Sequence, residues 1–376
     1  MNGQILEIIK KLEKNKIFDL IFEFLSSTLL SLIRNCTRKN LSGNIIIISL
    51  HKLGDSVFTI PAIMQIFEHF SNQNVYVLTF SENKNIYNTV LKKEYIIPLE
   101  KDGFFLGGRI ASKNAIDILK NLQPNIIFDL TGNITSASLI AASKAKEIVG
   151  MNTKYCKTIY DVFIPIKNKP HLIDRYLDAV KVYLPLDESK IIKEFPIKFE
   201  TGGKILIHPF AGWKAKEWNL NKFIELADLL NAEYEVEIVS PENLIPEDII
   251  HDIRDHQMPL SFTTSINDLV NKIKECSVFI SNDSGPLYIA NLLGKATFTI
   301  YGPTNPEFSL PFGKYHKFIQ KKIPCSPNGT QYCFTHAGLY CPSNECMNLL
   351  QVKEVHNTLQ SFLSELEIKQ KLMTNK

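Results

Sequence analysis

The chain has no hydrophobic run long enough to cross a membrane. The longest uncharged apolar stretch near its beginning, Phe24–Ile33, has ten residues, whereas a spanning helix needs about 20. Asp19 and Glu23 interrupt the apolar residues that follow Lys10 and Lys11, and no small-residue cleavage site follows, unlike in a signal peptide. We therefore expect a cytoplasmic protein with reduced thiols.

A strong excess of charge of either sign is also absent. The 42 Lys and Arg against 39 Asp and Glu leave a net charge of +3, which argues against a dedicated nucleic-acid binder. Hydrophobic residues make up 45% and charged residues 22%, a balance that excludes a disordered or collagen-like chain. The 376 residues suggest two or three domains. Neither a Rossmann G-x-G-x-x-G nor a Walker A sequence occurs.

Short apolar runs rich in β-branched residues begin at residue 44. Such runs are typical of strands buried on both faces of a parallel sheet, and helix-length segments lie between them. This alternation predicts an α/β fold with parallel sheets. We expect strands at 44–50, Val75–Thr79, Ile126–Leu130, Lys204–His208, Glu235–Val239, Ser277–Ser281 and Ala296–Tyr301, and helices at Ser56–Phe70, Ala111–Leu122, Leu220–Leu230 and Ile266–Glu275.

Pro and Gly residues that cluster at 185–203 suggest a boundary between two domains, 43–190 and 203–350, followed by a C-terminal helix at 351–376. Before them, 1–42 forms a basic extension. Its apolar residues recur at helical spacing and predict two amphipathic helices, with Ile5, Ile8, Ile9 and Leu12 in one and Phe18, Ile21, Phe22 and Leu25 in the other. The extension either packs on the body or a second subunit, or lies on an anionic membrane surface.

Three segments that follow predicted strands contain residues suited to binding or catalysis. In His51–Ser56, Gly54 permits a tight turn, and Asp55 is either a helix N-cap or a ligand-facing carboxylate. The loop 208–218 holds two lysines and the only two tryptophans; it suits a phosphate or sugar, or is a surface loop with Trp218 in the core. In 281–290, Pro286 suits a first helical turn whose free N–H groups favour a pyrophosphate, unless the helix is merely well capped.

These segments together resemble glycosyltransferase family 9, the heptosyltransferases of lipopolysaccharide core assembly. The matching motifs are K-L-G-D with the following Pro61-Ala62-Ile63, H-P-x-A-x-W-x-x-K-x-W at 208–218, N-D-S-G-P-L at 282–287, and Tyr301–Pro306. The resemblance covers about 44–360, with the four motifs in the family's order.

The resemblance implies a GT-B fold, in which two Rossmann-like domains face each other across a cleft, with the acceptor on the first domain and a nucleotide-sugar on the second. It makes Asp55 the catalytic base, with Lys52 and Gly54 on the acceptor side. Lys216 would contact the donor phosphate, and the backbone amides of Asp283, Ser284 and Gly285 would hold the diphosphate, with Tyr288 and Thr304 also facing the donor. Several relatives carry His at the position of Tyr288, which leaves the donor's identity open.

The residues also suggest a mechanism. No D-x-D pair occurs to hold a divalent ion on a diphosphate, so Lys216 and the helix start at Gly285 would supply the positive potential. Asp55 would take the proton of an attacking acceptor hydroxyl, and departure of the nucleoside diphosphate from the opposite face would invert the anomeric carbon. No cofactor is expected for catalysis.

Four of the seven cysteines, Cys325, Cys333, Cys341 and Cys346, lie within 22 residues. This cluster is either a structural zinc or iron site or a set of free thiols. No C-x-x-C, the spacing typical of zinc sites, occurs to decide between the two. Some relatives that glycosylate autotransporter proteins carry iron on cysteines, but their spacing does not match. His336 is a candidate additional ligand.

The leading function is therefore inverting heptosyl transfer, from ADP-heptose to a lipopolysaccharide core acceptor, with peripheral contact to the inner face of the cytoplasmic membrane. The alternatives are a relative with another donor or a protein acceptor, and a binding protein that has lost catalysis. Acceptor contacts are expected around Phe104–Arg109 and Thr131–Ser136. The basic residues Lys101, Arg109 and Lys113 either meet acceptor phosphates or are solvated.

Overall fold

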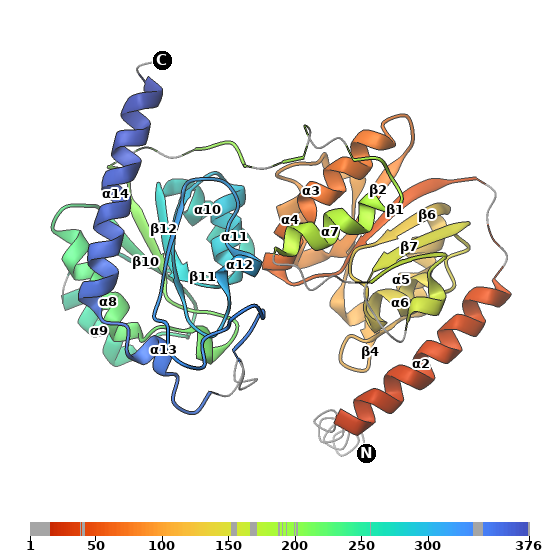
Figure 1. Cartoon of the computed structure of the whole chain (residues 1–376), viewed down its shortest axis with the longest axis horizontal. Helices are drawn as coiled ribbons and strands as arrows, with labels where there is room; N and C mark the ends of the chain where they lie inside the picture. The colour runs from red at the N-terminus through yellow and green to blue at the C-terminus, as the bar shows by residue number, and fades with distance from the viewer. Residues whose placement is uncertain are drawn as a thin grey trace. The chain divides into compact units, whose positions relative to one another are not determined.

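The computed structural model describes residues 16–37, 39, 42–151, 156–165, 171–186, 189, 191–192, 194–198, 200, 202–255, 257–333 and 341–374. Their contacts divide the chain into two units. The first takes in the described residues of 1–51, 59–168 and 173–191, and the second takes in those of 52–58, 169–172 and 192–376. Each unit is built around its own sheet (Figure 1).

The first unit contains a six-stranded sheet in the order β3-β2-β1-β6-β7-β8, with every pair parallel. Ile45, Ile46, Ile47 and Ile48 of the central strand are fully buried, as expected for a strand with helices on both faces. The strands are β1 (Asn44–Ser49), β2 (Val75–Phe80), β3 (Ile96–Leu99), β6 (Pro124–Asp129), β7 (Glu147–Met151) and β8 (Val162–Ile164), and β4 (Phe104–Phe105) pairs with β5 (Ile110–Ala111) in a small antiparallel hairpin.

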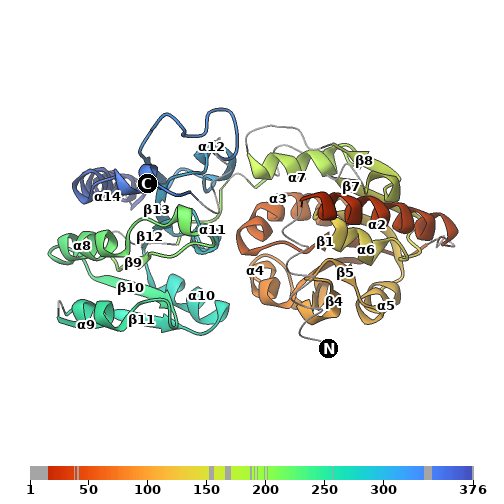
Figure 2. The ribbon, with the colours of Figure 1, turned by 90° about the horizontal axis from the view of Figure 1, so that it is seen from below.

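The helices around the first sheet include short and long elements (Figure 2). They are α2 (Lys16–Cys36), α3 (Leu53–His69), α4 (Lys84–Tyr87), α5 (Lys113–Asn121), α6 (Ile134–Ile140) and α7 (Leu172–Lys181). Short 3₁₀ turns occur at Ser81–Asn83, Lys93–Tyr95, Lys101–Gly103 and Lys157–Ile159. None of the described helices is both long and apolar enough to cross a membrane.

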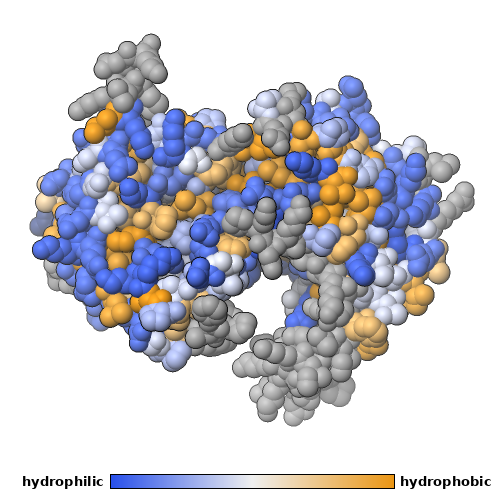
Figure 3. Space-filling view, viewed as in Figure 1, coloured by the Kyte–Doolittle hydropathy of each residue, from blue (hydrophilic) through white to orange (hydrophobic). Residues whose placement is uncertain are grey.

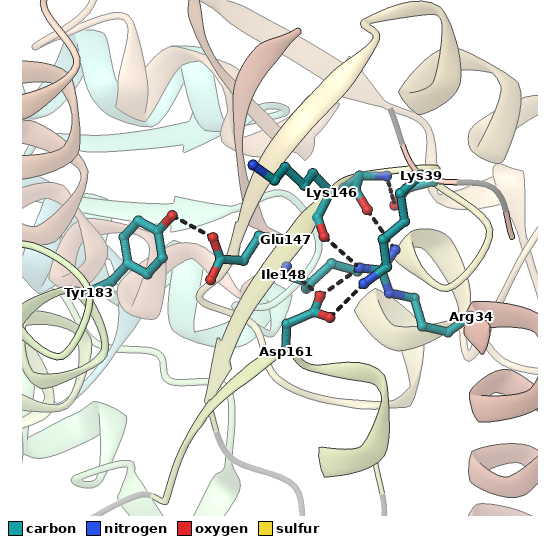
Figure 4. A network of polar contacts seen from close by, with 9 residues as sticks. Arg34, Lys39, Lys146, Glu147, Ile148, Asp161 and Tyr183 are labelled. Atoms are coloured by element: carbon teal, nitrogen blue, oxygen red, sulfur yellow. Dashed lines mark hydrogen bonds and ion pairs between the residues drawn. The ribbon is translucent and has the colours of Figure 1, made fainter. Parts of the chain in front are cut away.

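Helix α2 confirms the helix predicted over Phe18–Leu25 and continues to Cys36; the helix predicted over Ile5–Leu12 lies outside the described residues. A polar network attaches the end of α2 to the first sheet (Figure 4). The guanidinium of Arg34, which is 3% exposed, donates to the Ala145 carbonyl at 2.7 Å and pairs with Asp161. Lys39 pairs with the same carboxylate at 2.9 Å. The second half of α2 is therefore part of the folded body.

The second unit repeats the arrangement, with a parallel sheet in the order β11-β10-β9-β12-β13-β14. Its strands are β9 (Ile205–His208), β10 (Val236–Pro241), β11 (Leu260–Thr263), β12 (Val278–Asn282), β13 (Ala296–Tyr301) and β14 (His316–Gln320). Its helices are α8 (Leu220–Asn231), α9 (Glu247–Asp255), α10 (Ile266–Glu275), α11 (Gly285–Leu292), α12 (Pro306–Ser309), α13 (Glu345–Asn348) and α14 (Val352–Thr374), with a 3₁₀ turn at Lys214–Lys216. One face of α14 joins the same core as α8.

All seven strands predicted from apolar runs are present, and so are the four helices predicted between them and the C-terminal helix, as α14. Two helix starts were wrong. α3 begins at Leu53 rather than Ser56, and α5 begins at Lys113 because Ala111 pairs with Phe104 in the hairpin and Ser112 caps the helix. The strands that the sequence did not predict are β3, β7, β8, β11 and β14 of the two sheets, and β4 and β5 of the hairpin.

Candidate functional site

Three loops follow the neighbouring strands β9, β12 and β13, so they emerge together at the carboxyl edge of the second sheet. Ligands of open α/β sheets bind beyond this edge. The loops contain the lysine-rich segment after His208, the N-D-S-G segment that starts at Asn282, and the segment after Tyr301.

A buried polar cluster joins the three loops. The Lys216 ammonium lies 2.7 Å from one carboxylate oxygen of Asp283. The Thr304 hydroxyl donates to the same oxygen at 2.8 Å, and the Tyr288 hydroxyl donates to the other oxygen. Lys216 also lies over the Trp213 ring, 4.5 Å from its centre, in a cation–π contact. Residues far apart in the sequence thus hold one ammonium group at the sheet edge.

The surroundings of Asp283 favour its ionised form. Burial alone would raise the pKa of this carboxyl, but the charge of Lys216 and the hydrogen bonds from Lys216, Tyr288 and Thr304 outweigh burial and lower the pKa below its usual value. The Asp283 side chain therefore holds Lys216 in place. An ammonium has three N–H donors, so Lys216 keeps donors for an anion after its bond to Asp283.

Two hydrogen bonds of the Asn282 side chain, one donated and one accepted, fix the loop that carries Lys216. Its side-chain nitrogen donates to the Pro209 carbonyl at 2.7 Å, and its side-chain oxygen accepts from the Trp218 backbone N–H at 3.0 Å. The Trp218 indole is 1% exposed and donates to the Leu350 carbonyl at 3.0 Å, which confirms its place in the core. Lys214 is 89% exposed and pairs with Glu217. The two lysines of the loop therefore have different surroundings.

Helix α11 begins beside this cluster. Ser284 is its N-cap residue and Pro286 occupies its first turn, but the Ser284 side chain makes no capping bond. The Ser284 Oγ is buried and has no hydrogen-bond partner among the described residues. The N-terminus of an α-helix favours anions through its N–H groups and dipole. Lys216, the start of α11 and the Ser284 hydroxyl together suit an anionic ligand.

A pocket of about 190 Å³ in the second unit contains these groups. The residues to which the family resemblance assigns a role all line it: Lys52, Gly54, Asp55, Lys216, Asp283, Ser284, Gly285, Tyr288 and Thr304. Gly54 lies against the Tyr288 ring, where an added Cβ would come within 2.7 Å of a ring carbon. A residue larger than glycine at position 54 would therefore displace Tyr288.

Asp55 lies in the first turn of α3, which begins at Leu53, so its carboxylate is not at the N-cap position. It is half-buried and faces the pocket. Within the described part of the chain, its carboxylate makes no hydrogen bond or ion pair. Asp55 is therefore available to a ligand in the pocket.

The two predicted acceptor segments lie in the first unit and do not line this pocket. Residues 104–109 form β4 and the hairpin turn, and 131–136 form the loop that enters α6. The Thr135 hydroxyl donates to the Gly108 carbonyl at 2.9 Å, so the segments are in contact. Buried Asp129 accepts from the N–H groups of Thr131 and Gly132 at 3.0 and 3.1 Å, and burial raises its pKa despite these bonds. Lys101, 62% exposed, pairs with Glu82.

The four clustered cysteines line one small pocket, together with Gly302, Pro303 and Glu345 among others. Burial raises the pKa of the Cys346 thiol to about 11, and the other three thiols contribute in the same direction. None of the four forms a disulfide with another described cysteine. Among the described residues, no three Cys, His, Asp or Glu side chains are arranged to hold a metal ion as they stand. His336 lies outside the described residues.

Sequence reasoning missed several residues that line the larger pocket: Phe58, Leu172, Ser309, Gln331 and Tyr332. Tyr332 contacts the Trp213 ring, with ring centres 5.3 Å apart, and forms a β-bridge with Thr304. Only their position near a motif could have suggested them, because their side chains form no motif of their own.

Comparisons with known proteins identify relatives of this chain. The family model described as glycosyltransferase family 9 (heptosyltransferase) matches residues 116–337. Lipooligosaccharide heptosyltransferase 2 of Campylobacter jejuni is 26% identical over 307 residues, which cover 75% of this chain and 89% of the relative.

Among solved structures, the E. coli ADP-heptose LPS heptosyltransferase II superposes with a TM-score of 0.65 at 16% identity, covering 86% of this chain and 99% of that one. A family 9 glycosyltransferase from Veillonella parvula gives a TM-score of 0.68 at 16% identity, covering 86% and 97%. These similarities confirm the expected two-domain α/β fold with parallel sheets, of the GT-B type. With the family model matching more than half of its length, the chain belongs to glycosyltransferase family 9, the heptosyltransferase family, and is a glycosyltransferase.

Proposed function

We propose that this enzyme transfers a heptose from ADP-heptose to a lipopolysaccharide core acceptor, with inversion and without a metal ion. In this proposal the nucleotide-sugar binds to 203–350 and the acceptor to 43–190. The observation that carries the proposal is the pairing of Lys216 with Asp283 next to the start of α11. This part of the pocket presents the Lys216 ammonium, the buried Ser284 hydroxyl and the N-terminus of α11, which together suit a diphosphate.

The reaction needs a base and a stabilised leaving group. The Asp55 carboxylate takes the proton from an acceptor hydroxyl, whose oxygen forms a bond to the anomeric carbon of the donor sugar. The bond from that carbon to the phosphate oxygen breaks on the opposite face, and its electron pair leaves with the nucleoside diphosphate. Lys216 and the N–H groups at the start of α11 stabilise the charge that develops there.

Two substitutions in the full chain test the donor half of this proposal. Lys216→Ala removes the ammonium and should raise the Kd for ADP about 10-fold or more, because a charge-assisted bond contributes about 1.5–3 kcal/mol. Lys214→Ala is the matched control, because Lys214 is 89% exposed and points to solvent. Equal effects of the two substitutions in calorimetric titrations would overturn the role of Lys216.

Asp55→Asn tests the catalytic half. It should lower kcat by a factor of about 10²–10⁴ while the affinity for ADP stays within about twofold of wild type. Near-normal turnover would remove Asp55 as the base. Wild-type activity should persist in EDTA, and loss of turnover with recovery on adding Mg²⁺ would contradict metal-independent transfer.

Tyr288 favours an alternative function, in which the enzyme uses a donor with another base or sugar, or uses a protein as acceptor. Its hydroxyl donates to Asp283, and a buried tyrosine is not a cation at pH 7, unlike a histidine that gains a proton. A thermal-shift panel of ADP-, UDP- and GDP-linked sugars separates the donors. A shift with none of them would favour a binding protein that has lost catalysis.

We further propose that the first unit contacts an anionic membrane on its cytoplasmic side. Four apolar side chains of α2 are 58–61% exposed, namely Phe24, Leu25, Leu29 and Leu32. Phe105 and Leu106 of the hairpin are 60% and 46% exposed. Figures 1 and 2 place α2 and the hairpin on the same side of this unit, and Figure 3 shows hydrophobic residues at the surface there. Basic residues precede α2 at Lys10, Lys11 and Lys14 and would add about 1 kcal/mol each near anionic lipid.

Vesicle sedimentation tests this contact. Full-length protein should co-sediment with phosphatidylglycerol vesicles and not with phosphatidylcholine vesicles. Leu25→Glu with Leu29→Glu should abolish co-sedimentation, because both side chains are exposed, whereas Leu229→Glu on α8, 46% exposed, should not. Equal sedimentation of all three proteins would refute the membrane proposal.

A further inference from the structure

The four cysteines of the second unit line a single small pocket next to the loop that follows β13. The pocket has a volume of about 20 Å³, which is enough for one water-sized sphere. Cys333 and Cys346 are buried, and Cys325 and Cys341 are half-buried. Four cysteines are the ligand set of a structural Cys₄ site, and here all four line one small space.

The backbone turns bring these thiols to the pocket. Asn344, which lies between Cys341 and Cys346, adopts a left-handed conformation with φ 45° at the start of α13. The Asn344 N–H donates to the Cys341 sulfur at 3.3 Å. Beside Cys325, the Ser326 N–H donates to the Ile323 carbonyl and the Ile323 N–H donates to the Ser326 hydroxyl, both at 2.9 Å.

We propose that Cys325, Cys333, Cys341 and Cys346 bind one structural divalent metal ion, zinc or ferrous iron. Thiolates select such borderline-soft ions, and a tetrahedral set of four sulfurs suits either one. Binding replaces four S–H bonds by four metal–sulfur bonds and releases four protons to solvent. Because no three of the described side chains are arranged to hold an ion as they stand, the proposal requires the four cysteine side chains to rotate towards the centre of the pocket.

The metal site would fix the segment that ends at Cys333, which in turn holds the loop after β13 through backbone hydrogen bonds. The Cys333 N–H donates to the Pro303 carbonyl, and the Asn305 N–H donates to the Gln331 carbonyl, both at 3.0 Å. Thr304, between these two bonds, donates its hydroxyl to Asp283. A metal ion at the cysteines therefore fixes Thr304 through its neighbours. This consequence, unlike the metal site itself, rests on the proposed donor site.

Metal analysis of the full-length protein, purified with reductant and without chelator, is the primary test. It should show about one equivalent of zinc or iron per chain. Cys333→Ser and Cys346→Ser should lose the metal, lower the melting temperature by at least about 5 °C, and raise the Kd for ADP about fivefold. Cys36→Ser, at an exposed cysteine in α2, is the control and should match wild type.

Removal of the metal from wild-type protein keeps the test decisive if the serine variants do not fold. Chelation with phenanthroline should lower the melting temperature, and added zinc or ferrous iron should restore it. Less than about a tenth of an equivalent after expression in zinc- and iron-supplemented medium, with four thiols that react in the native state, would overturn the proposal. A loaded metal in a chain that binds no ADP would instead refute the donor site alone.

Discussion

The substitution Asp283→Asn tests the contribution of the negative charge at the centre of the buried polar cluster that joins the three loops. It keeps the size of the side chain and removes the negative charge that faces Lys216. The Asp283 carboxylate accepts hydrogen bonds from Lys216, Tyr288 and Thr304. The amide has one acceptor oxygen, so at least one of these donors loses its partner. The Lys216 ammonium, with a side chain 17% exposed, is left without its counter-charge.

The loss in the free energy of unfolding caused by Asp283→Asn follows from the burial of this ion pair. Removal of one partner of a buried ion pair costs about 3–5 kcal/mol. The remaining exposure of Lys216 places the cost at the lower end, about 3 kcal/mol. For a folding unit of this size, about 2–4 °C per kcal/mol converts that loss to a decrease of about 6–12 °C in the melting temperature.

The penalty should also depend on pH. The folded-state pKa of Asp283 is lowered, so the carboxylate contributes stability above the unfolded pKa of about 3.9. That contribution is lost as the pH falls through the folded-state value. The difference between wild type and Asp283→Asn should therefore be full at pH 5–7 and shrink below about pH 4.

Calorimetric melts at pH 7, 5 and 3.5 provide the measurement. Lys214→Ala serves as a control, because its exposed pair with Glu217 should contribute about 0–1 kcal/mol. In a double-mutant cycle with Lys216→Met, the coupling should be on the order of 2 kcal/mol. An equal penalty at pH 7 and pH 3.5, or a decrease below about 2 °C at pH 7, would refute the charge-pair reasoning.

Three further substitutions test other parts of the structure. Among the described residues, Arg34→Met leaves Asp161 with Lys39 as its remaining ion-pair partner. The substitution should lower the free energy of unfolding by about 2 kcal/mol and expose α2 to trypsin, and an unchanged digest would contradict the anchoring role. Gly150→Ala places a Cβ 2.0 Å from a ring carbon of Tyr160; it should lower the urea midpoint through a loss of about 1–3 kcal/mol, and a wild-type midpoint would show that the ring yields. Thr304→Val removes one donor to Asp283; it should raise the Kd for ADP about three- to tenfold, and an unchanged Kd would separate Thr304 from the donor site.

The strands that the sequence predicted and those that it did not predict occupy different positions in the sheets. Runs such as Asn44–Ser49 and Ala296–Tyr301 are buried on both faces and therefore apolar throughout. β3, β8, β11 and β14 are the edge strands of the two sheets. An edge strand is short or half-exposed and tolerates polar residues, as in β14, His316–Gln320. The inner strand β7 was not predicted because Glu147 and Gly150 interrupt its apolar run.

The site was predictable as a set of loops but not as a set of contacts. Motifs at strand ends singled out Lys216, Asp283 and Thr304, because ligands gather at the carboxyl edges of parallel sheets. Which loops are neighbours depends on the strand order, and the sequence of one chain does not encode that order as a local pattern. The pairing of the Asp283 side chain with Lys216 was therefore not foreseen. Tyr332 was missed for the same reason, since it reaches the pocket through its bridge with Thr304.

The two tryptophans give the enzyme separate optical signals. Trp218 is 1% exposed in the core of the second unit, so its fluorescence should be blue-shifted and change only when that unit unfolds. Trp213 lines the donor pocket, with the Lys216 ammonium 4.5 Å from its ring centre. A nucleotide that draws Lys216 towards its phosphates, or stacks on the indole, should change the Trp213 emission. A Trp218→Phe variant would leave a single reporter in the pocket, and titration in a fluorimeter would follow donor binding without a label.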